Sequence, residues 1–233
     1  MSFWARFQNC RAHRLFKTDN CEEFKMLISP EKSFTPFTVA DVVDGYQRRR
    51  IECDAEQSPR RRKILRNYIL HAMLEISGRY EEIFSRGLMA DHPEYEYFQE
   101  GVSFHGIDAV KGMYRGLTDN TSTAILSDPR KRRIAIADWG FAVEQVNHYY
   151  LNSELALQRG IPVRSGCSYV LHRPVSMLWN YDDKQRLIGE RLYHAAHSTY
   201  SEIDEEQFIL PEMLRNALAP LISVAQADLE KEG

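Results

Sequence analysis

Residues 101–117 read GVSFHGIDAVKGMYRGL, and residues 177–194 read MLWNYDDKQRLIGERLYH. The first stretch predicts a strand that turns at Gly106 into an amphipathic helix. The second stretch predicts a closing hairpin with Asp182-Asp183 at its turn, because the runs on either side are rich in aromatic and β-branched residues. A helix followed by paired strands indicates an α+β fold.

Long antiparallel strands are expected from Thr121 onward. Four segments separated by turn residues carry this pattern: TSTAILSD, RRIAIADWGFAVEQVNHYYL, GCSYVLHRPVSMLWNY and RLIGERLYH. Their β-branched and aromatic residues predict a meander. Pro174 cannot donate a hydrogen bond to a neighbouring strand, so it predicts a sheet edge or a bulge.

Helices are expected on both sides of these strands. Thr38 with Asp41 three residues later resembles a capping box and starts a helix at about residue 39. Ser58 and Pro59 begin a second helix with an apolar stripe, which ends at Gly78. Residues 210–232 predict an amphipathic C-terminal helix that is interrupted near Pro220.

Composition sets the class of protein. The chain has 233 residues, of which 43% are hydrophobic and 27% charged, and its net charge is −3. These values are typical of a globular protein and argue against a nucleic-acid binder, which normally carries a basic excess. No apolar run approaches the ~18 residues of a membrane span, and the first residues lack the apolar core of a signal peptide. We therefore expect a cytoplasmic protein without a membrane partner.

The chain divides into two parts. Residues 1–57 are expected to form an N-terminal arm and helix, and residues 58–233 a domain with a C-terminal helix. The four cysteines are widely separated in sequence, which favours reduced thiols over a disulfide framework.

The strand, Gly106 turn and helix of 101–117, together with the hairpin of 177–194, resemble the SnoaL-like branch of the nuclear-transport-factor-2-like superfamily. The resemblance covers roughly residues 60–200. It implies a cone-shaped α+β barrel in which a curved antiparallel sheet wraps around helices and an internal pocket, with the helix between Pro59 and Gly78 as a lid. It also implies a homodimer that buries the uncovered sheet face.

Candidate catalytic residues come from two strands. Glu190 and His194 share one face of the last strand, and the resemblance places an acid/base carboxylate where His194 stands. The His–Asp dyad of the dehydratase members is absent, because TSTAILSD has no His and Ile76 and Ser77 stand near the Asp position. The preceding long strand offers His148 and Tyr150. The candidates are therefore His194, His148, Tyr150 and Glu190.

An aromatic set predicts the pocket wall. Alternation along 168–181 places Tyr169, Met177, Trp179 and Tyr181 on one face if Pro174 does not shift the register. The substrate-binding candidates are Tyr68, Tyr97, Trp139, Tyr169, Met177, Trp179 and Tyr181. The same pattern is also expected of a filled core or a subunit interface.

No metal or cofactor is expected. His194 and His197 lack a third ligand at a defined spacing, and no nucleotide-binding or serine-hydrolase motif occurs. The resemblance then implies a cofactor-independent lyase that acts on a small hydrophobic, hydroxylated and aromatic compound, such as a lignin-derived diarylpropane that loses formaldehyde. The alternatives are a non-catalytic ligand-binding or interaction module, and an epoxide hydrolase or isomerase of the same fold.

Overall fold

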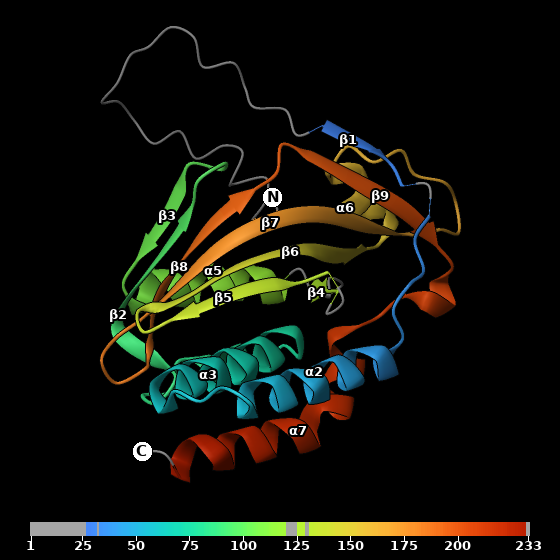
Figure 1. The fold of residues 1–233 in the computed structure, drawn as a ribbon. Helices are drawn as coiled ribbons and strands as arrows, with labels where there is room; N and C mark the ends of the chain where they lie inside the picture. Colours follow the sequence, from blue (N-terminus) through green and yellow to red (C-terminus); the bar gives the residue numbers. More distant parts are fainter. Residues whose placement is uncertain (1–26, 32, 120–124, 129–130, 232–233) are drawn as a thin grey trace, which may run out of the picture.

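A computed structural model describes residues 27–31, 33–119, 125–128 and 131–231. The first 26 residues of the predicted arm, with Cys10 and Cys21, and the start of the strand expected from Thr121 lie outside these ranges. The described chain is an α+β fold, in which a curved sheet arches over helices (Figure 1).

Nine strands form this sheet. They are β1 (Leu27–Pro30), β2 (Met89–Tyr97), β3 (Val102–His105), β4 (Ile125–Ser127), β5 (Arg133–Ala137), β6 (Gly140–Leu151), β7 (Ser168–Tyr181), β8 (Leu187–His194) and β9 (His197–Ile203). The helices are α2 (Val39–Asp54), α3 (Pro59–Ile76), α4 (Tyr80–Ile83), α5 (Ile107–Asp119), α6 (Ser153–Gln158), the short 3₁₀ turn η1 (Glu205–Gln207) and α7 (Pro211–Lys231).

Strand β7 is the centre of the sheet. Residues 169–180 of β7 pair with β6 along one edge. The other edge is divided between β9, which pairs with residues 168–172, and β8, which pairs with residues 175–181. Pro174 falls between these two partners, where the lack of an N–H leaves no ladder bond unmade. The expectation of a bulge at Pro174 was wrong, because the register with β6 continues past it. The expectation of an edge holds locally, because Pro174 lies in the gap between β9 and β8.

The sheet is mixed rather than antiparallel throughout. β1 runs parallel to β9, and β2 runs parallel to β8. The local sequence pattern predicted the hairpins of the meander, but β1 and β2 come from earlier parts of the chain. A strand that joins a sheet from a distant segment is not held antiparallel by a short turn.

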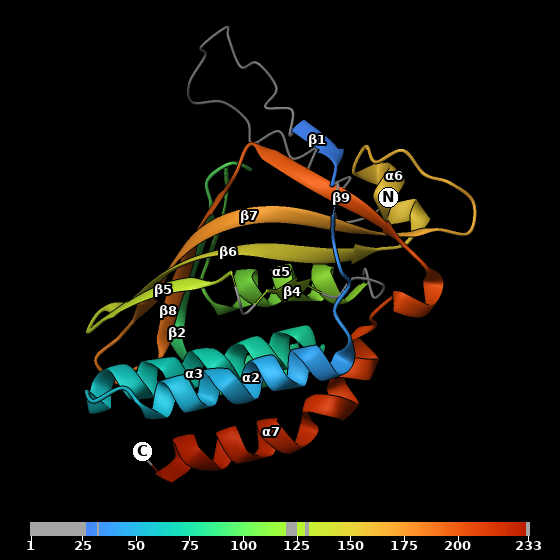
Figure 2. The same ribbon diagram turned by 45° about the vertical axis from the view of Figure 1, so that its right-hand side comes forward.

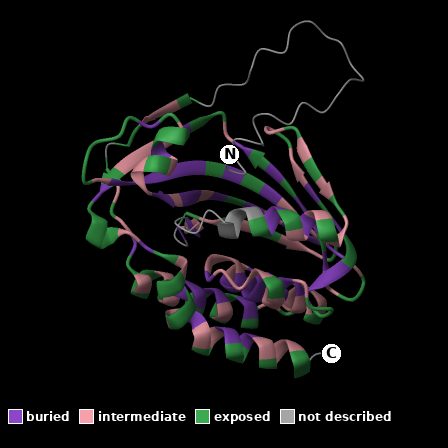
Figure 3. Cartoon of the chain, turned by 180° about the vertical axis from the view of Figure 1, so that it is seen from behind, coloured by how far each residue is buried: buried purple, intermediate pink, exposed green. Residues whose placement is uncertain are grey.

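The helices form layers below the sheet. Figure 2 shows α2 and α3 side by side under the sheet, with α7 on their far side. The predicted caps are confirmed. Thr38 and Asp41 cap α2 reciprocally, and Ser58 Oγ accepts a hydrogen bond from the Arg61 N–H at the start of α3. Because α3 lies between α7 and the sheet, eight of its 18 residues are buried, and Figure 3 colours the chain by burial.

Helix α7 continues through Pro220, so the predicted interruption was wrong. Pro220 is exposed and lies outside the buried stripe of the helix, which is formed by Leu214, Leu218, Ile222 and Ala225. Water can therefore hydrogen-bond the carbonyl left free four residues earlier. Within the described chain, the helical segment Glu205–Lys231 is long and apolar enough by length and composition to span a membrane. Here its stripe packs against α2 and α3.

Gly189 fixes the approach of β8 to β2. Its φ is +155°, and a Cβ built there would lie 1.8 Å from the Glu94 carbonyl oxygen. The register of β2 against β8 also shifts between Met89 and Glu94. Only glycine allows this backbone approach.

We predict that Gly189→Ala lowers the free energy of unfolding by about 2–4 kcal/mol, because a backbone clash is added to an unfavourable φ. Gly87→Ala is the matched control, since a Cβ there meets no atom within 4 Å. Urea unfolding of both variants measures the effect. Equal stability of the two variants would contradict this account of β8.

Candidate functional site

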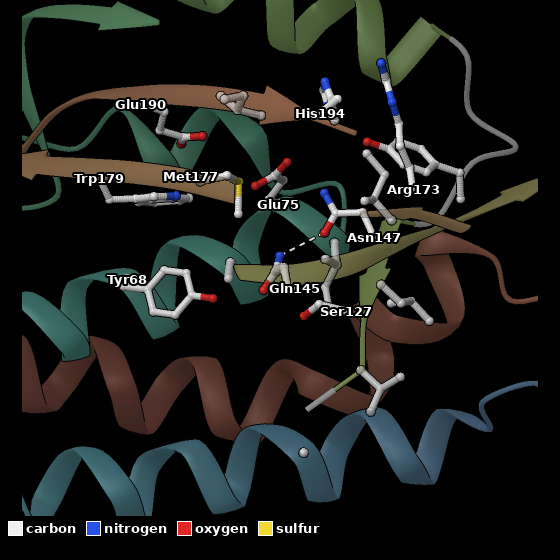
Figure 4. Close-up of a pocket in the computed structure, with 18 of the residues that line it drawn as sticks. Tyr68, Glu75, Ser127, Gln145, Asn147, Arg173, Met177, Trp179, Glu190 and His194 are labelled. Carbon is white, nitrogen blue, oxygen red and sulfur yellow. Dashed lines mark hydrogen bonds between the residues drawn. The ribbon is translucent and has the colours of Figure 1, made fainter. Parts of the chain in front are cut away.

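A cavity of about 140 Å³ lies between the sheet and helices α2 and α3. Its apolar and aromatic wall includes Phe37, Tyr46, Tyr68, Tyr97, Tyr114, Met177, Trp179 and Leu192. Its polar lining includes Arg49, Glu75, Glu100, Ser127, Gln145, Asn147, Arg173, Glu190 and His194. Figure 4 shows Glu190 and Trp179 toward one end, His194 and Arg173 toward the other, and Glu75 between them.

Two carboxyl groups face this cavity without a cationic partner. Glu75 comes from α3 with 26% of its side chain exposed, and Glu190 comes from β8 with 7% exposed. In the described chain, the one ion-pairing neighbour of either group is His71, whose Nε2 lies 4.0 Å from Glu75 Oε2 and 3.8 Å from Glu190 Oε1. The two carboxyl groups therefore share one buried imidazole.

The pKa values of these groups follow from burial. Desolvation lowers the pKa of His71 to about 3, so the imidazole is neutral at pH 7 and cannot compensate a carboxylate. Desolvation raises the pKa of Glu75 to about 7. Burial and the nearby Glu75 raise the pKa of Glu190 well above its ordinary value. At neutral pH the pair thus keeps a proton, and Glu190 is its carboxylic acid.

Tyrosines connect this pair to His71. His71 Nε2 lies 2.9 Å from Tyr114 Oη, which lies 3.5 Å from Tyr95 Oη. Tyr95 in turn hydrogen-bonds Glu190, an interaction that favours the carboxylate and partly opposes desolvation. Burial raises the pKa of both tyrosines well above 10, so they remain neutral hydrogen-bonding groups.

A conventional ion cluster occupies the other end. Arg173 Nη2 donates to Glu100 Oε1 at 2.6 Å, and His194 Nδ1 lies 3.1 Å from the same oxygen. Burial alone would raise the pKa of Glu100, but the hydrogen bond from His194 and the charge of Arg173 outweigh it and lower this pKa to about 2. Burial lowers the pKa of His194 despite Glu100. The charges of this cluster compensate one another, unlike those of the Glu75–Glu190 pair, although Arg173 Nε and His194 Nε2 are buried without a hydrogen-bond partner.

The predicted catalytic residues do not all meet. Glu190 and His194 both line the cavity, but four residues of strand separate them by about 13 Å. His148 and Tyr150 do not line it. His148 Nδ1 lies 2.7 Å from His172 Nδ1, and Tyr150 Oη accepts a hydrogen bond from the Phe37 N–H. We therefore assign His148 and Tyr150 to packing around residues 34–37.

The predicted aromatic wall divides in the same way. Tyr68, Tyr97, Met177 and Trp179 line the cavity. Tyr181 is buried in the main core, and Trp139 is 46% exposed in the β5–β6 turn. Tyr169 belongs to a separate core cluster with Leu151, Ala156, Ile161 and Leu171. Alternation gave the face of each residue correctly, but α6 covers that face near Tyr169 and the cavity does not extend there.

Sequence reasoning missed Glu75, although a signal was present. Tyr68, Ala72 and Glu75 follow the i, i+4, i+7 spacing of one helical face, so a carboxylate interrupts an apolar stripe. The resemblance placed the Asp of the His–Asp dyad near Ile76 and Ser77, which are the next two positions. Arg49, His71, Gln145, Asn147 and Arg173 had no comparable signal, because separate elements bring them together.

Among the described residues, no three His, Cys, Asp or Glu side chains are placed to hold a metal ion. Comparison of the sequence with known proteins found no matching family model and no matching curated protein. The geometry of the cavity therefore carries the functional argument.

We predict that Glu190 makes the protein less stable at alkaline pH. Its folded pKa is raised above the ordinary 4.5, so the stability that its proton provides is lost as pH rises through the folded pKa. From the ordinary pKa of 4.5 up to the folded pKa, the free energy of unfolding should fall by up to about 1.4 kcal/mol per pH unit from this one proton. Glu190→Gln should flatten that slope.

The control is Glu144→Gln, which removes an exposed carboxylate from β6. It should keep the wild-type slope in denaturant unfolding measured at each pH unit from pH 5 to pH 8. A wild-type slope in Glu190→Gln would mean that Glu190 is not a buried acid.

Proposed function

We propose that this protein is a cofactor-independent lyase, in which Glu75 and Glu190 act as base and acid to remove water from a small, largely apolar hydroxylated compound. The observation that supports it is the pair itself, a buried and a partly buried carboxyl group that face one cavity and lack a cation. Strongly perturbed carboxyl groups in a cleft are typical of catalytic acids and bases.

The two groups differ in a way that assigns their roles. Glu190, the more deeply buried, carries the proton and donates it to the departing hydroxyl group. Glu75, with a pKa of about 7, takes a proton from the neighbouring carbon as the C–O bond breaks and the double bond forms. The hydroxyl group and the donated proton leave together as water. Proton exchange with solvent then returns Glu75 to its ionised form and Glu190 to its protonated form. Each transfer contributes about 10²–10⁴ in rate.

The cavity supports a substrate with one ring. Its volume is close to the ~150 Å³ of an engineered apolar cavity that binds benzene. Tyr68 and Trp179 pack edge to face with centroids 5.1 Å apart and offer aromatic surfaces to such a ring. A diarylpropane has two rings, so we favour dehydration of a single-ring compound over the loss of formaldehyde from a diarylpropane.

The fold is also compatible with this proposal. A curved sheet faces α3 across the cavity, which is the arrangement expected of the SnoaL-like and nuclear-transport-factor-2-like cone. We retain that resemblance as a proposal, with the homodimer that it implies. Epoxide hydrolysis is less favoured, because within the described residues neither Glu75 nor Glu190 has an arginine at ion-pair distance.

We predict that Glu75→Gln lowers turnover by about 10²–10⁴ without loss of folding. Single-ring secondary and tertiary alcohols, screened by mass spectrometry for the loss of 18 mass units characteristic of water, supply the assay. The pH profile of the wild type should rise near pH 7 as Glu75 ionises, and fall at higher pH as Glu190 ionises.

Glu144→Gln should retain full turnover and serves as the control. Saturable binding without turnover of any alcohol would favour a ligand-binding module instead.

The same assay tests the sequence-based assignment of His194 as the acid or base. Because His194 is engaged with Glu100, we predict that His194→Gln lowers turnover by less than about 10-fold. A loss equal to that of Glu75→Gln, in a variant with unchanged thermal unfolding, would return the acid/base role to His194.

A further inference from the structure

Arg49 is a buried cation that lines the same cavity. It projects from α2 with only 4% of its surface exposed. Its Nη2 donates to Ser127 Oγ at 2.7 Å, and its guanidinium lies 4.7 Å from the centroid of the Tyr46 ring. Its Nε has no hydrogen-bond partner. Within the described ranges, no carboxylate lies within the 4.0 Å of an ion pair with Arg49.

This isolation is costly. Arginine cannot be neutralised by losing its proton, and a buried charge without a counter-charge is strongly destabilising. Arg173, the comparable arginine at the cavity, has Glu100 at 2.6 Å. Arg49 has the hydroxyl group of Ser127 and the ring and hydroxyl group of Tyr46, which carry no charge at neutral pH. Glu52, whose charge also acts on Arg49, forms its ion pair with Arg132. The charge of Arg49 is therefore available to a ligand.

Polar groups on the neighbouring strands surround this position. Ser127 of β4 stands opposite Asn147 of β6 in the sheet register. Gln145 Nε2 donates to Asn147 Oδ1 at 2.8 Å, while Gln145 Oε1 is buried without a partner. Figure 4 shows Ser127, Gln145 and Asn147 gathered on one side of the cavity. These groups can hydrogen-bond a polar ligand group placed beside Arg49.

We infer that the ligand of this cavity carries a carboxylate, which Arg49 holds while the ring-sized apolar body of the ligand lies toward Trp179 and Glu75. A carboxylate fits because a guanidinium binds two coplanar oxygens, and because it is ionised at neutral pH. That this ligand is also the substrate, a hydroxylated single-ring carboxylic acid, rests on the proposed function.

The test compares benzoate with benzamide, which has the same shape and no charge. Isothermal titration calorimetry at pH 7 should give wild-type binding of benzoate at least 10-fold tighter than that of benzamide. Arg49→Gln should reduce the ratio to near one, and Arg49→Lys should keep part of it. Arg48→Gln is the matched control, because Arg48 is the exposed neighbour on the same helix, and it should keep the full ratio.

Equal affinities of the wild type for the two compounds would overturn the inference. A benzoate preference that survives in folded Arg49→Gln would overturn it as well. Should Arg49→Gln fail to fold, the ratio of benzoate to benzamide affinity is compared between the wild type and Arg49→Lys. A lower ratio in Arg49→Lys supports the inference, and an unchanged ratio overturns it.

The outcome is separable from that of the lyase proposal. A benzoate preference that depends on Arg49, found without turnover of any alcohol, supports the carboxylate site and removes the lyase. Turnover that depends on Glu75, found with equal binding of benzoate and benzamide, supports the lyase and removes the carboxylate site.

Discussion

The backbone N–H and C=O groups of β7 form hydrogen bonds with three strands, β6, β8 and β9. The position of the cavity follows from which part of β7 each strand pairs with. β6 pairs with residues 169–180 along one edge, while β8 and β9 divide the other at Pro174. The sheet therefore curves instead of lying flat over the helices. Met177 and Trp179 of β7 then face α3, and β8 places Glu190 beside them. The site is thus a consequence of ladder pairing as much as of side-chain packing.

Polar groups at this cavity fall into two kinds. Glu100, Arg173 and His194 compensate one another, as buried charges in a stable protein usually do. Glu75, Glu190 and Arg49 have no opposite charge at ion-pair distance in the described chain that could offset the cost of removing them from water. Buried polar groups that lower the stability of the folded protein are typical of functional sites, because the arrangement needed for activity is often a destabilising one.

Local features of the fold were predictable, whereas contacts between distant segments were not. The caps at Thr38 and Ser58 and the outline of the hairpins depend on neighbouring residues, and the structure confirms them. The parallel pairing of β2 with β8 depends on segments about 90 residues apart. For the site, alternation identified Trp179 and Glu190, but it could not show that α6 would cover Tyr169. Glu75 was recognisable only as a polar residue on an apolar stripe.

The separation of Glu75 from Arg49 matters more than the presence of either. Both residues line one cavity. In the described chain the ion-pair neighbour of Glu75 is His71 and not Arg49, and desolvation raises the pKa of Glu75 to about 7. A direct ion pair would hold Glu75 permanently ionised with a pKa too low for a base, and would occupy the guanidinium. Because the two groups stay apart, a ligand that spans the cavity meets a cation at one end and a proton acceptor further along.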